Sequence, residues 1–297
     1  MPGAVTIESE AMRVAVLPAF GARVVSLLDK RSAREWMFEG GQTSDTGEDA
    51  VYGADAAVGW DECFPTVSPW DASQTAWQRR LRDHGDIWGR PWAVDAHDTQ
   101  SLTTTYATAE FAFSRSLSVD GPVLTAAYRV ENRMAVEMPF LWALHGLLAA
   151  TVADRVDLPG RTAVSTTYLA RAGKSFSVPA VPWPGSRLEL GFDLDEVQPE
   201  AAGFAGKFYD QGGERRAALG HGDQWLVMGW SPPIDALGIW LNYGGWPDPP
   251  RGHHIALEPT TAPADHLGEA LRTGEATWIK PGAAATWTIT LTLARTP

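Results

Sequence analysis

The sequence has a single cysteine, Cys63, among its 297 residues. No internal disulfide can form, so neither a disulfide scaffold nor a thiolate metal site is expected. Basic side chains are also scarce, with 24 Lys and Arg against 36 Asp and Glu, which gives a net charge of −12. This balance disfavours nucleic acid and anionic membranes as partners. A neutral or cationic small molecule remains open as the ligand.

Long hydrophobic runs and targeting signals are missing as well. Residues 1–8 show no basic region followed by an apolar core, and no run reaches the roughly 20 apolar residues of a membrane span. Internal repeats, phosphate loops and His/Cys clusters with metal spacing are not found, so no metal is expected. We therefore expect a cytoplasmic protein with one domain over residues 1–297, as a monomer or weak homodimer.

Short β-type runs separated by turn signals recur along the chain and predict a mostly β, antiparallel fold. Residues 12–18 and 20–30 are separated by a Pro/Gly turn and predict a hairpin. Runs at 102–106 and 122–130 predict an antiparallel meander. Threonine alternates with apolar residues over 286–293, which predicts one buried and one solvent-facing side.

Two further segments carry weaker signals. Residues 139–150 are apolar at odd and even positions alike, which predicts one strand buried on both faces. Residues 39–59 are rich in Gly, Asp, Ser and Ala without periodicity and predict a long ordered loop.

Tryptophan is the compositional outlier, with 14 residues. An indole offers a flat apolar face and one donor, which suits the C–H face and the hydroxyls of a sugar ring. Core packing is the competing explanation for many of them. Trp60, Trp88 and Trp246 stand in segments that also contain Gly or charged residues, so we expect these three to supply a sugar-binding wall.

Three titratable residues have unusual settings. Glu258 ends an apolar run directly before Pro259, where a strand is expected to open into a pocket, and it is the candidate general base. His84 lies among glycines, charges and indoles in a predicted loop. His145, followed by Gly146, interrupts the apolar run, and is either a satisfied core histidine or a group at the floor of a site.

Two acids lie between aromatics in the segment 60–64. Asp61 is the candidate for binding sugar hydroxyls, since such a segment can line a pocket wall. The rival interpretation is that Asp61 or Glu62 accepts hydrogen bonds from backbone amides in a turn.

Taken together, four segments resemble the aldose 1-epimerase (galactose mutarotase-like) family: Gly59-Trp60-Asp61-Glu62-Cys63-Phe64-Pro65, His84-Gly85, His145-Gly146 and Leu257-Glu258-Pro259-Thr260-Thr261. The resemblance implies a large antiparallel β-supersandwich and an isomerase that interconverts the anomers of an aldose without a cofactor. It also implies that Glu258 takes the proton of the C1 hydroxyl, that His145 protonates the ring oxygen and that His84 steadies the developing charge. A carboxylate and an imidazole suit this acid–base chemistry near neutral pH.

The chain departs from the family pattern at one position. Many members place an aspartate before a basic–apolar–tyrosine sequence that holds sugar hydroxyls, and here Gly206 precedes Lys207-Phe208-Tyr209. The substrate is therefore open, as a free or modified hexose. Lys207 is a candidate for binding a hydroxyl, an acidic group or a phosphate, or it is a solvated surface lysine.

Two other functions remain as alternatives. A sugar-binding or regulatory protein would use the same tryptophans without turnover. A lyase or other epimerase would reuse the Glu/His pair on a glycoside or a keto sugar.

Overall fold

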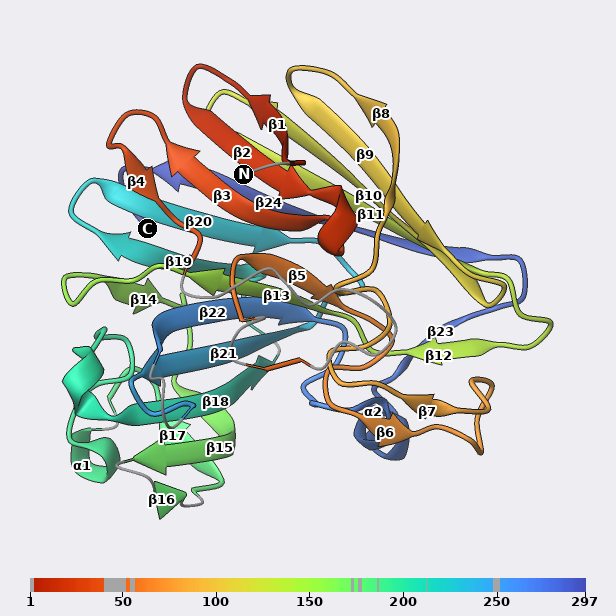
Figure 1. Cartoon of the computed structure of the whole chain (residues 1–297). Helices are drawn as coiled ribbons and strands as arrows, with labels where there is room; N and C mark the ends of the chain where they lie inside the picture. The colour runs from red at the N-terminus through yellow and green to blue at the C-terminus, as the bar shows by residue number, and fades with distance from the viewer. Residues whose placement is uncertain are drawn as a thin grey trace.

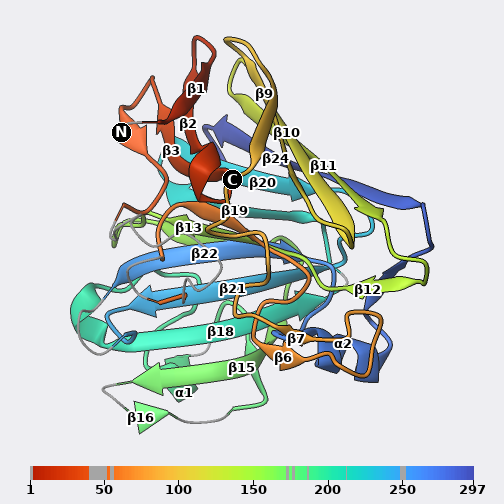
Figure 2. The same ribbon diagram turned by 45° about the vertical axis from the view of Figure 1, so that its right-hand side comes forward.

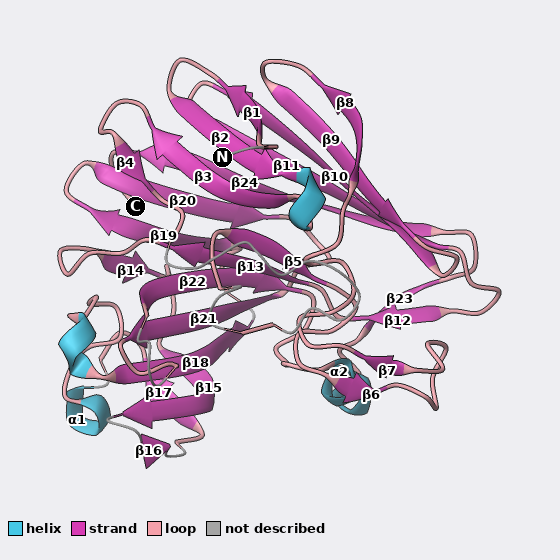
Figure 3. Cartoon of the chain, in the orientation of Figure 1, coloured by secondary structure: helices cyan, strands magenta, loops and turns pink. Residues whose placement is uncertain are grey.

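The computed structural model describes residues 3–39, 52–53, 57–171, 174–175, 178–185, 187–211, 213–247 and 252–297. Strands dominate this part of the chain (Figure 3), as the sequence patterns predict. Most of the predicted long loop lies outside the described residues.

A twelve-stranded antiparallel sheet is the larger of two main layers in the described ranges. Its strands follow the spatial order β1 (Val5–Glu8), β2 (Met12–Leu17), β3 (Arg23–Asp29), β5 (Trp60–Cys63), β13 (Ala143–Leu148), β22 (His253–Thr260), β21 (Ala236–Tyr243), β18 (Phe204–Gln211), β15 (Ala163–Arg171) and β16 (Lys174–Ser175). Strands β4 (Arg34–Glu35) and β17 (Ala180–Pro182) pair with β3 and β15.

The second layer is an eight-stranded sheet in the same described part of the chain. Its order is β14 (Arg155–Asp157), β19 (Arg216–His221), β20 (Gln224–Trp230), β24 (Ala284–Ala294), β11 (Val123–Asn132), β10 (Phe111–Asp120), β9 (Ser101–Ala107) and β8 (Ala93–His97). Figures 1 and 2 show this sheet behind the larger one, as in a β-sandwich.

Small elements complete the described structure. Two short pairs are β12 (Met138–Phe140) with β23 (Thr277–Ile279) and β6 (Trp70–Asp71) with β7 (Arg80–Leu81). Helical segments are η1 (Pro18–Phe20), α1 (Arg187–Leu190), η3 (Glu200–Ala202) and α2 (Leu267–Thr273). Among the described residues, no helix is long and apolar enough to cross a membrane.

Several predicted elements are confirmed. β2 and β3 pair as the predicted hairpin, and β9, β10 and β11 pair as the predicted meander. In β24, Trp287, Ile289 and Leu291 are buried, whereas the threonines between them are partly exposed. The prediction of one strand over 139–150 is wrong: β12 pairs with β23, and β13 belongs to the large sheet. A continuous apolar run does not reveal where a chain changes its partner strand.

A buried carboxylate links the two sheets. Glu62 on β5 is fully buried, and its Oε1 accepts hydrogen bonds from Arg115 on β10 (2.8 Å), Tyr128 on β11 (2.9 Å) and the indole of Trp60 (3.0 Å). Its Oε2 accepts one from the indole of Trp142 (2.9 Å). Neither predicted role, a pocket wall or a turn, applies to Glu62. Its charge is buried because donors from both sheets surround it.

Candidate functional site

A cavity of about 320 Å³ opens on the face of the large sheet opposite the sheet–sheet core. Asp61 and Glu62 are neighbours on β5 and therefore point to opposite faces. Since Glu62 faces the core, Asp61 and its cross-strand partner His145 face the cavity side. The volume falls at the lower end of the range for small-molecule sites, about 300–1,000 Å³.

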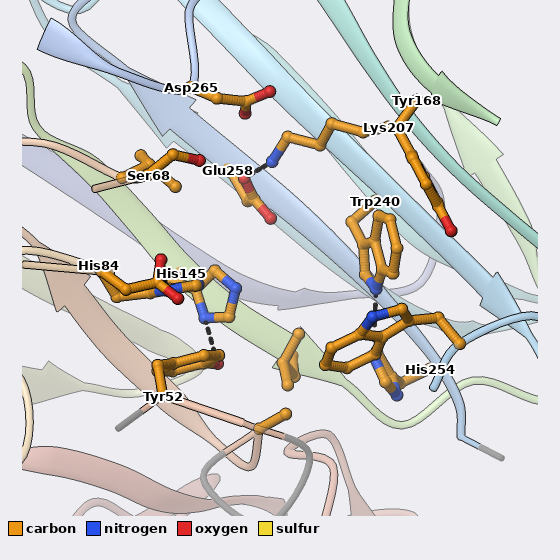
Figure 4. Close-up of a pocket in the computed structure, with 15 residues that line it drawn as sticks. Tyr52, Ser68, His84, His145, Tyr168, Lys207, Trp240, His254, Glu258 and Asp265 are labelled. Atoms are coloured by element: carbon orange, nitrogen blue, oxygen red, sulfur yellow. Dashed lines mark hydrogen bonds and ion pairs between the residues drawn. The ribbon is translucent and has the colours of Figure 1, made fainter. Parts of the chain in front are cut away.

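The three predicted acid–base residues line this cavity (Figure 4). His145 comes from β13 and Glu258 from β22, and the antiparallel pairing of these strands directs both to the same face. His84 comes from the loop after β7, and its ring centroid lies 4.9 Å from that of His145. The structure thus brings together residues 84, 145 and 258, while their catalytic roles stay predictions.

The loop that carries His84 has a constrained backbone. His84 is in the left-handed region at φ 57°, an uncommon conformation for a residue other than glycine. Gly85 follows at φ 75°, and a Cβ there would lie 2.1 Å from the carbonyl oxygen of Phe64. Only glycine fits so close to the backbone of Phe64. The ring of His84 stacks on Tyr52 at 3.4 Å between centroids.

Burial keeps His145 neutral. Desolvation, together with the electrostatic influence of His84 and Lys207, holds the pKa of His145 well below its ordinary 6.5. Its Nδ1 lies 3.2 Å from the hydroxyl of Tyr52. Burial and the charge of Asp61 raise the pKa of Tyr52 well above 10, so the hydroxyl keeps its proton. The other ring nitrogen, Nε2, points into the cavity in Figure 4.

Glu258 forms a buried ion pair with Lys207, whose ammonium donates to Oε2. Burial disfavours the charged lysine, but the attraction of Glu258 and of Asp265 outweighs it and raises the pKa of Lys207 above 10.5. Gly238 lies on β21 between their strands, and a Cβ there would be 3.0 Å from Oε2 and 3.2 Å from Nζ. The missing side chain gives the ammonium room to reach across β21. Oε1 of Glu258 has no hydrogen-bond partner among the described residues.

Three predicted substrate contacts are wrong, because Trp60, Asp61 and Trp88 are each only 1% exposed and do not line the cavity. Trp60 shares the core-facing side of β5 with Glu62. The carboxylate of Asp61 is taken by Arg23, with Nη2–Oδ2 at 2.6 Å. The indole of Trp88 donates to the carbonyl of Asp83 at 2.7 Å and lies behind Tyr52.

The other two predicted contacts, Lys207 and Trp246, do line the cavity. Sequence reasoning missed further lining residues, among them Tyr52, Tyr168, Trp240, His254 and Asp265. Tyr52 was hidden in the segment taken as a long loop, and Trp240 in an ordinary strand. His254 stands in the apolar run before Glu258, and no local signal marks it as a site residue. Cross-strand register, which a single sequence does not show, brings Trp240 and His254 to the site.

Gly206 does not leave a gap in the cavity. It shares a face of β18 with Phe204 and Phe208, and a Cβ there would lie 2.7–2.9 Å from their rings. A side chain at this position would point into the core. The departure from the family pattern therefore removes no group from the cavity of this chain.

Acidification is expected to destabilise the protein through His254. Its Nε2 accepts a hydrogen bond from the indole of Trp240 at 3.1 Å, and burial, with a smaller contribution from His253, lowers its pKa from 6.5 to about 3. Between these values the unfolded chain binds a proton that the folded chain does not. Stability is then complete above pH 6.5 and falls toward pH 3, by about 2 kcal/mol at pH 5 from this residue.

Urea unfolding at pH 7 and pH 5 measures this effect. The variant His254→Gln should lose less stability on acidification than the parent protein. His97→Gln is the matched control, because His97 is exposed on β8. Equal losses in the parent protein and in His254→Gln would contradict the prediction.

The donor set does not suggest a metal site. Among the described residues, no group of three or more His, Cys, Asp or Glu side chains is arranged to hold an ion. The polar groups that line the cavity are imidazoles, carboxylates, phenols, the hydroxyl of Ser68 and the ammonium of Lys207.

No family model and no curated protein matches the sequence. Solved structures do match over almost the whole chain. A putative aldose 1-epimerase from Escherichia coli K12 has 15% identity and a TM-score of 0.71, covering 99% of each chain. A galactose mutarotase related enzyme from Lactobacillus acidophilus has 16% identity and a TM-score of 0.67, covering 99% of this chain and 98% of its own. A galactose mutarotase-like protein from Clostridium acetobutylicum has 15% identity and a TM-score of 0.67, covering 99% and 95%. The chain therefore has the fold of galactose mutarotase-like proteins, as its sequence motifs predict.

Proposed function

From the galactose mutarotase-like fold and the content of its cavity, we propose that the protein interconverts the anomers of an aldose. One observation carries the proposal: His84, His145 and Glu258 line the same cavity. A pyranose presents its C1 hydroxyl and its ring oxygen on adjacent atoms. A base and a proton donor on the same face of one sheet suit this substrate.

In the proposed reaction, Glu258 accepts the proton of the C1 hydroxyl through Oε1, because Oε2 is held by Lys207. The bond between C1 and the ring oxygen breaks, a C1 carbonyl forms, and the ring oxygen receives the Nε2 proton of His145. For this step His145 takes up a second proton from solvent, and it returns to the neutral imidazole, with Nδ1 beside the hydroxyl of Tyr52, when the ring oxygen takes the Nε2 proton. His84 lies beside this donor and steadies the developing charge. Rotation about C1–C2 and reversal of these transfers give the other anomer.

Anomer exchange measured by NMR or polarimetry on a panel of aldoses tests the proposal. At least one sugar should equilibrate faster than in buffer alone by orders of magnitude. If no aldose on the panel exchanges faster, the assignment as an isomerase fails.

A second candidate function is sugar binding without turnover. It is favoured by the ion pair of Lys207 with Glu258, which occupies one oxygen of the proposed base. A binding protein would show saturable quenching of indole fluorescence by a sugar that it does not convert. A lyase or other epimerase using the same pair would instead change the product, which product analysis detects.

A further inference from the structure

The cavity has an apolar half that the proposed proton transfers do not use. Tyr168, Trp240 and Trp246 line it, together with Leu147 and Ala57. Ala57, Leu147 and Ala256 form a hydrophobic cluster distinct from the main core, against which Trp240 and Trp246 pack. Trp240 contacts Trp246 edge to face at 6.0 Å and Tyr168 at 5.9 Å. Figure 4 shows Tyr168 and Trp240 across the cavity from His84 and Tyr52.

Buried polar residues hold these partly exposed indoles in place. His254, which is 3% exposed, accepts the N–H of Trp240. Asn242 is fully buried, and its side-chain amide donates a hydrogen bond to the carbonyl of Trp246 at 2.6 Å. Its Oδ1 accepts hydrogen bonds from the backbone N–H groups of Gly245 and Trp246. A polar side chain costs free energy to bury unless it is hydrogen-bonded. Here two such residues fix the wall of a cavity.

Strand register sets the distance of this wall from the acid–base groups. Gly238 on β21 pairs with Glu258, and Trp240 lies two residues further along the same strand. Two residues of a strand span about 7 Å. Trp240 also pairs with Lys207 on β18, and Lys207 pairs in turn with Tyr168 on β15. The aromatic wall is therefore displaced from Glu258 by about the width of one sugar ring.

The wall combines flat faces with unused donors. Neither the hydroxyl of Tyr168 nor the indole N–H of Trp246 has a hydrogen-bond partner among the described residues. Aromatic faces suit the C–H face of a pyranose, and free donors suit its hydroxyls. An alkyl or acyl group would leave these donors unpaired at the contact. The arrangement favours a second sugar ring.

We propose that the substrate is the reducing-end residue of a disaccharide or longer oligosaccharide. The reducing-end ring would lie between His145 and Glu258, and the next ring would stack on Trp240 and Trp246. This inference rests on the proposed function for the identity of the first ring. The inference of a second ring rests on the aromatic wall alone.

The test compares anomer exchange of glucose and galactose with that of cellobiose, maltose and lactose. We expect kcat/KM to be about tenfold or more higher for at least one disaccharide than for its reducing-end hexose. Trp246→Ala and, independently, Tyr168→Ala should reduce this ratio several-fold. Trp278→Ala, which removes an indole exposed on β23, is the matched control and should retain the ratio. Equal kcat/KM for hexoses and disaccharides, or a ratio unchanged in both variants, would overturn the inference.

Binding to Glu258→Gln separates this inference from the proposed function. If no sugar exchanges its anomers faster, the same panel is titrated by calorimetry. Disaccharide affinity about tenfold above hexose affinity, lost in the double variant with Trp246→Ala, would support the second subsite while the isomerase proposal fails. Equal affinities, or no binding of any disaccharide, would overturn the subsite.

Discussion

Replacement of Glu258 by glutamine is expected to slow anomer exchange by about 100-fold or more. Glutamine keeps the size of the side chain, and its carbonyl oxygen can still accept from Lys207, but it cannot take the proton of the C1 hydroxyl. The effect should appear in kcat, because the lost step is proton transfer. Exchange spectroscopy on the most active sugar of the panel measures it.

Glu137→Gln is the matched control, because Glu137 is exposed in the segment before β12. His145→Ala should also slow exchange by about 100-fold or more, since it removes the proposed proton donor. Far-ultraviolet circular dichroism checks that each variant is folded. Parent-like rates in both Glu258→Gln and His145→Ala would end the assignment of these residues as base and acid.

Replacement of Glu62 by leucine is expected to lower the free energy of unfolding by about 3–5 kcal/mol. Arg115 would remain fully buried without its carboxylate, and Tyr128 and two indoles would lose their acceptor. Burial raises the pKa of Glu62, and the charge of Arg115 opposes this shift, so the two residues depend on each other. Urea unfolding monitored by tryptophan fluorescence gives the free energy from the midpoint and slope.

The double variant Glu62→Leu/Arg115→Met provides the comparison. It removes both charges and should be more stable than Glu62→Leu alone, because no uncompensated cation is left in the core. A single variant within 1 kcal/mol of the parent protein would contradict the role of Glu62 as the link between the sheets.

Local patterns were sufficient to predict much of the fold. The hairpin of β2 and β3 and the alternating strand β24 follow from turn residues and period-two alternation, which are encoded within each segment. The split of residues 139–150 into β12 and β13 was not predictable, because it depends on distant partner strands.

Some residues of the candidate site could likewise be predicted from local sequence, and others could not. His84, His145 and Glu258 were recognisable because each has an unusual neighbour, glycine or proline, in the sequence. Trp240 entered the cavity through its register with Lys207, and no local signal marks it. Trp60 was misassigned because richness in tryptophan does not say which face of a strand an indole occupies.

Strand β5 separates two structural roles by the alternation of its side chains. Positions 60 and 62 serve the contact between the sheets, whereas positions 61 and 63 lie on the face that carries the cavity. A substitution at one set can therefore alter one face of the sheet and leave the contacts of the other face in place. Solved structures at 15–16% identity share this architecture, so the fold does not require most of the side chains of this sequence.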